Sequence, residues 1–180
     1  MIDATGRMKK PSIRPFSMDE LRRIKETLDQ NGSPADRLLY SLMLTGMRAS
    51  QCRSIKAQDL VIQADHSINV KGVTLPNVNA QSTLRLLSSK RAQGDNYVFP
   101  CDSALNSAMT PAQFSSKFSS WLRTANVCQA GRSPHAVRLS VIAASMEAMR
   151  QPSMHNNRVI GETNLGMIQH YSPGKRLPKA

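Results

Sequence analysis

The 180-residue chain has few cysteines, few aromatic residues and no long apolar run. Its three cysteines, Cys52, Cys101 and Cys128, are widely spaced and follow neither a metal-ligand pattern nor a disulfide framework, which predicts a protein of the reducing cytoplasm. No stretch of about 18 apolar residues is present, so the sequence predicts no membrane span. Aromatic residues make up only 4% of the chain, which argues against a module that stacks single-stranded bases on its surface.

Carboxylates are also scarce, above all in the second part of the chain. The formal net charge is +12, and residues 103–180 hold nine Lys or Arg but only two acidic residues, Glu147 and Glu162. Such a surface attracts polyanions, and binding to DNA would release counterions from its phosphates. A charge kept for solubility and binding to an anionic membrane are alternatives, but no basic amphipathic helix favours a membrane. The composition therefore favours nucleic acid as the partner.

The hydrophobic pattern predicts a mainly helical domain with one small antiparallel sheet, an α+β fold. Capping residues and a 3.6-residue apolar period predict the helices. Short β-branched segments between polar turns predict the strands. Helices are expected over residues 17–31, 34–46, 49–56, 79–91 and 164–170 and from residues 110 and 133. Extended segments are expected over residues 60–62, 67–70, 73–75 and 97–100.

The two ends of the chain differ from this domain in composition. Residues 1–16 are basic and contain Pro11 and Pro15, which predicts a flexible arm. Residues 174–180 are predicted to form a basic, mobile tail. One domain is expected between them, over residues 17–173. Three of its aromatic residues are expected in the core: Phe114, Phe118 and Trp121.

Three short segments carry the groups that a phosphate-transfer site needs. In Leu-Thr-Gly-Met-Arg-Ala-Ser-Gln, Gly46 breaks a helix and places Arg48 beside the start of the next, where a guanidinium can form paired hydrogen bonds with a phosphate. In Ser-Pro-His-Ala-Val-Arg, His135 and Arg138 are three residues apart and are expected on one helix face. In Gln-His-Tyr-Ser-Pro, Tyr171 precedes a helix stop and can present its hydroxyl to a cleft. Each segment also has a plainer interpretation: a solvated arginine, a surface pair and a tyrosine ring packed on the core.

The order of these segments resembles the tyrosine recombinase, or phage integrase, family over nearly all of residues 17–173. The Thr-Gly-Met-Arg-Ala-Ser stretch is similar to the family's first arginine box, and the other two segments are similar to its His-x-x-Arg box and its nucleophile segment. The family places a lysine in a β-hairpin between the arginine boxes, where Lys71 falls. In size the chain resembles most the DNA invertases of the fimbrial-switch type, which are short and lack the usual N-terminal core-binding domain. The resemblance implies that residues 17–173 form a tyrosine recombinase catalytic domain.

The resemblance also implies a reaction, in which Tyr171 attacks a DNA phosphate and forms a 3′-phosphotyrosyl link. Arg48 and Arg138 would hold the non-bridging oxygens, Lys71 would protonate the departing 5′ oxygen, and His135 would assist in proton handling or phosphate contact. Because two guanidiniums supply the positive charge, no metal or other cofactor is expected. The implied partners are double-stranded DNA and further copies of the chain in a tetramer, and neither a membrane nor a small-molecule substrate. The implied location is the bacterial cytoplasm, at the nucleoid, with a phage or plasmid as a further source.

The chain departs from the family pattern in four places. Gln51 replaces an acidic residue after the first arginine, and Leu139 replaces a histidine after the second. Glu162 stands at the third-box position, where a carboxylate would repel a phosphate, and the hairpin around Lys71 is short. These departures leave three alternatives to an active recombinase open: a catalytically weakened DNA-binding protein with the same fold, a topoisomerase-like nicking-closing enzyme and a generic basic RNA-binding protein.

Overall fold

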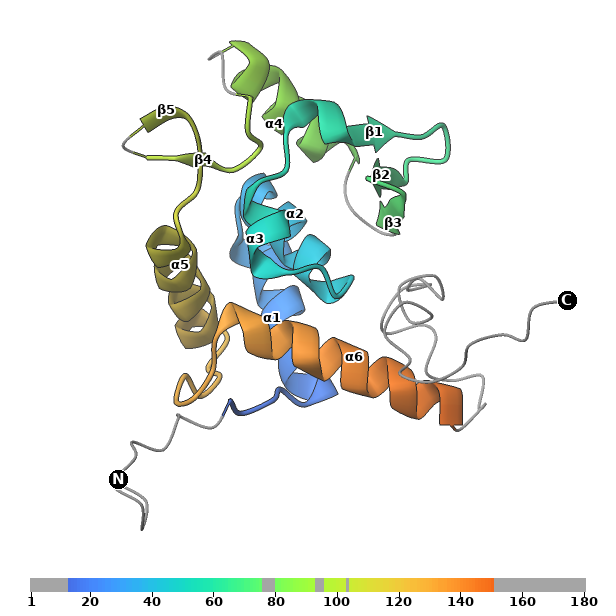
Figure 1. Cartoon of the computed structure of the whole chain (residues 1–180), viewed down its shortest axis with the longest axis vertical. Helices are drawn as coiled ribbons and strands as arrows, with labels where there is room; N and C mark the ends of the chain where they lie inside the picture. The colour runs from blue at the N-terminus through green and yellow to red at the C-terminus, as the bar shows by residue number, and fades with distance from the viewer. Residues whose placement is uncertain (1–12, 76–79, 93–95, 103, 151–180) are drawn as a thin grey trace, which may run out of the picture.

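The computed structural model describes residues 13–75, 80–92, 96–102 and 104–150 (Figure 1). No helix in this described part is long and apolar enough to cross a membrane. The helices are α1 (Met18–Asn31), α2 (Pro34–Leu44), α3 (Ala49–Arg53), the 3-10 helix η1 (Ala57–Asp59), α4 (Ala80–Ala92), α5 (Pro111–Thr124) and α6 (Pro134–Arg150). The strands are β1 (Leu60–Ile62), β2 (Ile68–Val70), β3 (Val73–Leu75), β4 (Pro100–Cys101) and β5 (Ala104–Ala108).

Helices α1, α2 and α5 begin where the sequence predicts, because each has a hydroxyl-bearing cap. The Ser17 hydroxyl accepts a hydrogen bond from the Glu20 N–H at 3.2 Å, and the Glu20 carboxylate accepts one from the Ser17 N–H at 2.8 Å. The same arrangement opens α2 at Ser33 and α5 at Thr110, each followed by a proline in the first turn. These caps fix the directions of three helices that enclose the core.

The three-stranded sheet is antiparallel, with the order β1–β2–β3. Val70 pairs with Leu60 on one side and with Val73 on the other, which leaves Lys71 and Gly72 as the turn between β2 and β3. Both turn residues have positive φ, +50° and +83°, as the tight hairpin turn that matches strand twist requires. The predicted mainly helical fold with a small antiparallel sheet is confirmed, and β1–β3 form the sheet where it was expected.

The elements differ from the expected ones in two places. The third helix ends at Arg53, and η1 forms separately because the Asp59 side chain accepts a hydrogen bond from the Lys56 N–H at 2.9 Å and caps a new turn. A second antiparallel sheet pairs β5 with β4, which begins at Pro100, the last residue of the expected extended segment. Strand β5 was not predicted, because its alanine, asparagine and serine residues have weak strand preference.

Helices α1, α2 and α5 pack around an aromatic core. Helix α6 crosses one end of this layer and contacts α1 and α2 (Figure 1). The Trp121 ring makes edge-to-face contacts with Tyr40, Phe114 and Phe118, at centroid distances of 6.0, 6.5 and 6.1 Å. The buried Tyr40 hydroxyl donates a hydrogen bond to the Leu21 carbonyl at 3.0 Å. The expectation that Phe114, Phe118 and Trp121 lie in the core is therefore confirmed.

Residues 14–16, from the end of the predicted arm, are held against the α5–α6 connection. The Arg14 N–H donates a hydrogen bond to the Gly131 carbonyl at 2.9 Å. The buried Phe16 donates its N–H to the Ser140 hydroxyl of α6 at 2.7 Å. Residues 1–12 lie outside the described part of the chain.

Three side chains strengthen this attachment, and we call them the Arg132 cluster: Phe16, Glu20 and Arg132. The Arg132 guanidinium lies over the Phe16 ring, 4.4 Å from its centroid, and NH1 lies 2.9 Å from Glu20 Oε2. The Arg132 side chain is only 2% exposed. A buried cation is stable only with a counter-charge, so Glu20 links the start of α1 to the loop that leads into α6.

Candidate functional site

The turn between α2 and α3 carries Arg48. Gly46 has φ +80°, a conformation that glycine adopts without a Cβ clash, and the chain changes direction there. Arg48 is the exposed cap residue of α3, and its N–H donates a hydrogen bond to Gln51 Oε1 at 3.0 Å. Gln51 therefore fixes the start of α3 with a neutral amide, at the position where the family pattern has an acidic residue.

Arg138 joins the two arginine segments. Arg138 is 6% exposed, and its Nη1 donates a hydrogen bond to the carbonyl of Gly46, which lies 92 residues earlier in the chain. Its charge also acts on Cys52 of α3. Burial raises the pKa of the Cys52 thiol to about 12, while a backbone hydrogen bond and the charge of Arg138 oppose the rise. Arg138 thus lies where α6 meets the α2–α3 turn.

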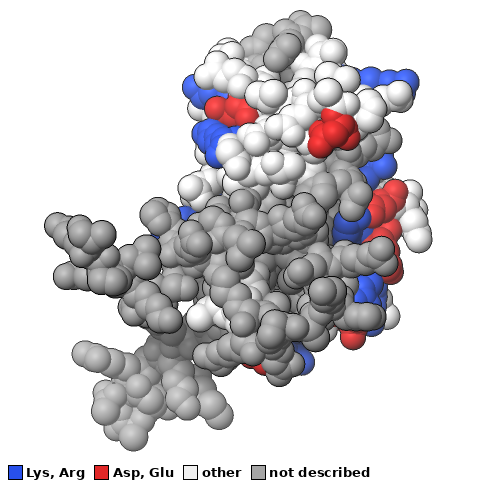
Figure 2. All heavy atoms as spheres, turned by 90° about the vertical axis from the view of Figure 1, so that its right-hand side faces the viewer, with Lys and Arg blue, Asp and Glu red and all other residues white. Residues whose placement is uncertain are grey.

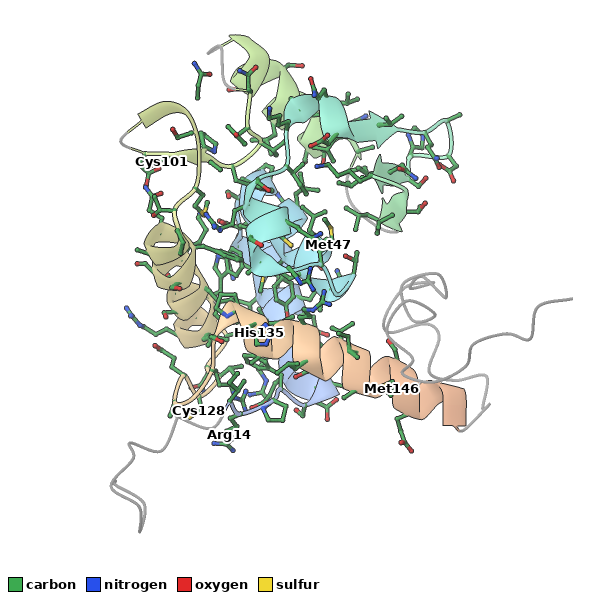
Figure 3. All side chains as sticks on the ribbon, viewed as in Figure 1. Arg14, Met47, Cys101, Cys128, His135 and Met146 are labelled. Carbon is green, nitrogen blue, oxygen red and sulfur yellow. The ribbon has the colours of Figure 1, made fainter. Side chains whose placement is uncertain are left out.

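His135 lies on the first turn of α6, one helical turn before Arg138 (Figure 3). The two residues differ in exposure, because His135 is exposed and Arg138 is buried. The three-residue spacing does place both near the start of α6, but the guanidinium turns inward to the Gly46 carbonyl. An anion that approached this helix end would meet the imidazole first, beside backbone N–H groups that favour negative charge.

Lys71 lies at the tip of the β2–β3 hairpin, on an element separate from the two arginine segments. Its Nζ is 3.2 Å from Asp59 Oδ2, the same oxygen that accepts the Lys56 N–H bond. Asp59 is not among the residues that the sequence motifs predict for the site. The signal that could have found it is the strand register, since the pairing of Leu60 with Val70 places Asp59 opposite Lys71. In the view of Figure 1, the α2–α3 turn lies between this sheet and α6.

Two of the predicted site residues, Tyr171 and Glu162, lie outside the described residues. The predicted meeting of the nucleophile with Arg48, His135 and Arg138 therefore stays a prediction. Leu139, which stands where the family has a histidine, is described and is 40% exposed on α6.

The charges around the sheet are mixed. Figure 2 shows the side of the molecule that faces right in Figure 1, and on its upper, described part Lys and Arg side chains lie beside Asp and Glu side chains. Opposite charges near each other reduce the local attraction for a polyanion. In the part of the chain that the structure describes, no group of three or more His, Cys, Asp or Glu side chains could hold a metal ion.

A groove of about 490 Å³ lies elsewhere, between the end of α1, α5 and the β4–β5 sheet. Its lining residues include Trp121 and the ion pair of Lys117 and Asp36, whose charged atoms are 2.6 Å apart. None of the described site residues that the sequence predicts lines this groove. It is therefore a feature separate from the arginine segments.

No family model matches the chain, and no curated protein matches it. Solved structures do match. A crystal structure of the XerH site-specific recombinase bound to palindromic difH substrate, a post-cleavage complex, has a TM-score of 0.61 at 16% identity, over 94% of this chain and 49% of that chain. A pre-cleavage complex of XerH with difH substrate has a TM-score of 0.56 at 15% identity, over 97% and 56% of the two chains. The XerA recombinase has a TM-score of 0.59 at 15% identity, over 91% and 67%.

The chain therefore has the fold of a tyrosine recombinase catalytic domain. At identities of 15–16%, the likeness to XerH and XerA is a likeness of fold. The chain spans about half the length of the XerH chains that it matches.

Proposed function

We propose that the chain is a tyrosine-type site-specific recombinase that acts on duplex DNA. The observation that carries this proposal is the hydrogen bond from Arg138 to the Gly46 carbonyl, because it brings the second arginine segment to the turn that presents Arg48. The fold shared with XerH and XerA and the net charge of +12 support the same proposal. DNA is the proposed partner because XerH, with this fold, is a site-specific recombinase bound to its difH substrate.

In the proposed reaction, the Tyr171 oxygen attacks the phosphorus of one DNA strand. The new P–O bond forms while the bond to the 5′ oxygen breaks, and the resulting 3′-phosphotyrosyl link keeps the energy needed to rejoin the strand. Arg48 and Arg138 hold the two non-bridging oxygens, since guanidiniums can bind them through paired hydrogen bonds. Lys71 gives a proton to the departing 5′ oxygen, and His135 assists in proton handling or contacts the phosphate.

The proposed assembly and outcome follow the same family resemblance. Strand exchange needs several copies of the chain on DNA, so we propose a tetramer that forms at the target site. Inversion, as in the short fimbrial-switch invertases, is the finer proposal for the outcome. Integration and excision use the same chemistry and differ in how the sites are arranged, so the recombinant products distinguish them.

A catalytically weakened DNA-binding protein is the second candidate function. It is favoured by Leu139, a 40% exposed apolar side chain at the position of the family's second histidine, directly after Arg138. An apolar side chain there cannot donate a hydrogen bond to a phosphate. Gln51 does not add to this case, because its amide oxygen keeps a hydrogen bond to the Arg48 N–H.

The test is a covalent trapping experiment. Duplexes would first be selected from a random pool by binding to Tyr171→Phe, which keeps the ring but lacks the attacking oxygen. Nicked half-sites of the selected duplexes would then be incubated with the parent protein, because the short cut strand diffuses away and leaves the protein attached. We expect a protein–DNA adduct that survives denaturant in the parent protein and in Tyr97→Phe, and no adduct in Tyr171→Phe.

The outcomes separate the candidate functions. Salt-sensitive DNA binding without an adduct on any selected site would favour the weakened DNA-binding protein. Relaxation of supercoiled DNA without recombinant product would favour a nicking-closing enzyme. An adduct that persists in Tyr171→Phe would refute the assignment of the nucleophile.

A further inference from the structure

Lys71 is held by a carboxylate that competes with the phosphate it is proposed to contact. Its ammonium lies 3.2 Å from Asp59 Oδ2, and the two side chains differ in exposure, with 56% of Lys71 and 17% of Asp59 accessible. Asp59 is therefore the fixed member of the pair and Lys71 the accessible one. Any effect of Asp59 on DNA binding through Lys71 rests on the proposed function of Lys71 at a DNA phosphate.

Asp59 is held in place by the backbone around it. Its Oδ2 accepts the Lys56 N–H at 2.9 Å and so caps η1, directly before β1 begins. The antiparallel pairing of Leu60 with Val70 places Asp59, which precedes β1, opposite Lys71, which follows β2. The carboxylate is thus positioned by a cap and by a strand register, and it does not depend on Lys71 for its place.

Lys71 is also held from its own side. It has φ +50°, a left-handed conformation that non-glycine residues rarely adopt, at a turn position where Asn, Asp or Gly is preferred. The Asn69 side chain accepts the Gly72 N–H at 2.9 Å and stabilises this turn. A lysine in this place points its ammonium back across the sheet to the start of β1, where Asp59 lies.

We propose that Asp59 is an intramolecular competitor for DNA at Lys71, so that a phosphate must replace the carboxylate before the ammonium can act on the DNA. The exchange replaces one ion pair with another and therefore reduces the gain in binding that Lys71 would otherwise give. Because of this competition, we expect the β2–β3 hairpin to bind weakly to any DNA that does not place a phosphate within reach of Lys71. Asp59 is a positioning residue in this proposal, since it acts through Lys71 and does not itself touch the DNA.

A double-mutant cycle in DNA binding tests this proposal, with the full chain in the Tyr171→Phe background so that cleavage does not interfere. The probe is a fluorescein-labelled duplex of mixed sequence, and the Kd is measured by anisotropy between about 0.05 and 0.2 M salt. We expect Asp59→Asn to tighten binding about three- to fivefold at low salt, because a lysine freed from its pair adds a phosphate contact. The same change in a Lys71→Met background is expected to alter the Kd by less than about 1.5-fold.

Matched controls separate this effect from a general change of net charge. Asp65→Asn removes one negative charge from the turn at the other end of β2, where the carboxylate accepts hydrogen bonds from Ser67 and pairs with no lysine in the described structure. It is expected to tighten binding less than Asp59→Asn does. Asp59→Ser keeps an oxygen that can cap the Lys56 N–H and is expected to match Asp59→Asn, so it serves if the Asn variant folds poorly.

The results distinguish this inference from the proposed function. Equal Kd values for the parent and for both Asp59 variants, with DNA binding intact, would overturn the competition and leave the recombinase proposal standing. An Asp59→Asn gain of the same size in the Lys71→Met background would also overturn it, because Asp59 would then act by simple repulsion. Absence of DNA binding in every protein would overturn both proposals.

Discussion

The substitution Glu20→Gln isolates the charge on which the Arg132 cluster depends. Glutamine has nearly the same shape and keeps an oxygen that can accept the Ser17 N–H, so the cap of α1 is retained. The Arg132 side chain would stay buried without its counter-charge. In the described structure Nε has no hydrogen-bond partner and Nη1 has the ion pair with Glu20, so loss of the Glu20 charge would leave Nη1 without its counter-charge beside an already unsatisfied Nε.

The expected loss can be estimated from the exposure of the two partners. Breaking a fully buried ion pair by removing one partner costs about 3–5 kcal/mol. The Glu20 side chain is 24% exposed, so water screens part of its charge, and the contact of Arg132 with the Phe16 ring remains. We therefore expect the free energy of unfolding to fall by about 2 kcal/mol. Arg132→Met removes the buried cation together with its requirement for Glu20, and it is expected to cost about 1 kcal/mol.

The effect of Glu20→Gln depends on pH in a defined direction. Desolvation by burial acts to raise the pKa of Glu20, but the hydrogen bonds and charge of Arg132 and the bonds with Ser17 outweigh it and lower the pKa. A lowered pKa in the folded state gives stability that is present above the unfolded carboxyl value and is lost as the pH falls through the folded value. The difference between the parent and Glu20→Gln should therefore shrink in acid.

Urea denaturation followed by far-UV circular dichroism, at neutral pH and in acid, measures these differences. Glu26→Gln is the control, because Glu26 lies on the exposed face of the same helix and carries the same charge. We expect this control to change stability by less than about 0.5 kcal/mol. Equal losses in the two glutamine variants, or a larger loss in Arg132→Met than in Glu20→Gln, would refute the reasoning.

Three further predictions concern residues of the core and the site. Gly46→Ala should lower the free energy of unfolding by about 1 kcal/mol and Gly46→Asn by less, because asparagine tolerates φ +80° better; urea denaturation decides this. Tyr40→Phe should cost about 1 kcal/mol, since the buried Leu21 carbonyl loses its hydroxyl donor, and an unchanged Tm would contradict the bond. Cys128, which is exposed, should react with a maleimide in the native protein at neutral pH. Cys52, with a pKa of about 12, should react only after denaturation, and mass spectrometry of the labelled protein distinguishes the two.

Much of the fold could be predicted because its signals are local. The capping box of Ser17 and Glu20 predicts the start of α1, and the proline after Ser33 predicts the start of α2. The β-branched segments predict the three strands to within one residue, since β2 begins at Ile68 where 67 was expected. Strand β5 could not be predicted, because its pairing with β4 depends on tertiary position and its residues carry no strand pattern.

The sequence predicts which residues form the candidate site, but it could not predict how the described ones are arranged. The motif spacing predicts Arg48, His135 and Arg138 as site residues, and the structure brings Arg138 to the turn that carries Arg48. Spacing alone cannot show that Arg138 is buried and His135 exposed, because the inward turn of the guanidinium depends on a carbonyl 92 residues away. The ion pairs Glu20–Arg132 and Asp59–Lys71 were missed for the same reason, since each joins segments whose contact only the fold creates.

Trp121, the single tryptophan of the chain, lies in contact with rings from α2 and α5 and is almost fully buried. Its fluorescence emission is consequently an intrinsic reporter of the helical layer and of the groove that Trp121 lines, without any attached dye. Because the β1–β3 sheet contributes no aromatic partner to this ring in the described structure, loss of the hairpin that carries Lys71 would leave the emission unchanged. Emission and backbone signals recorded on one sample would therefore reveal whether the hairpin opens before the helices do.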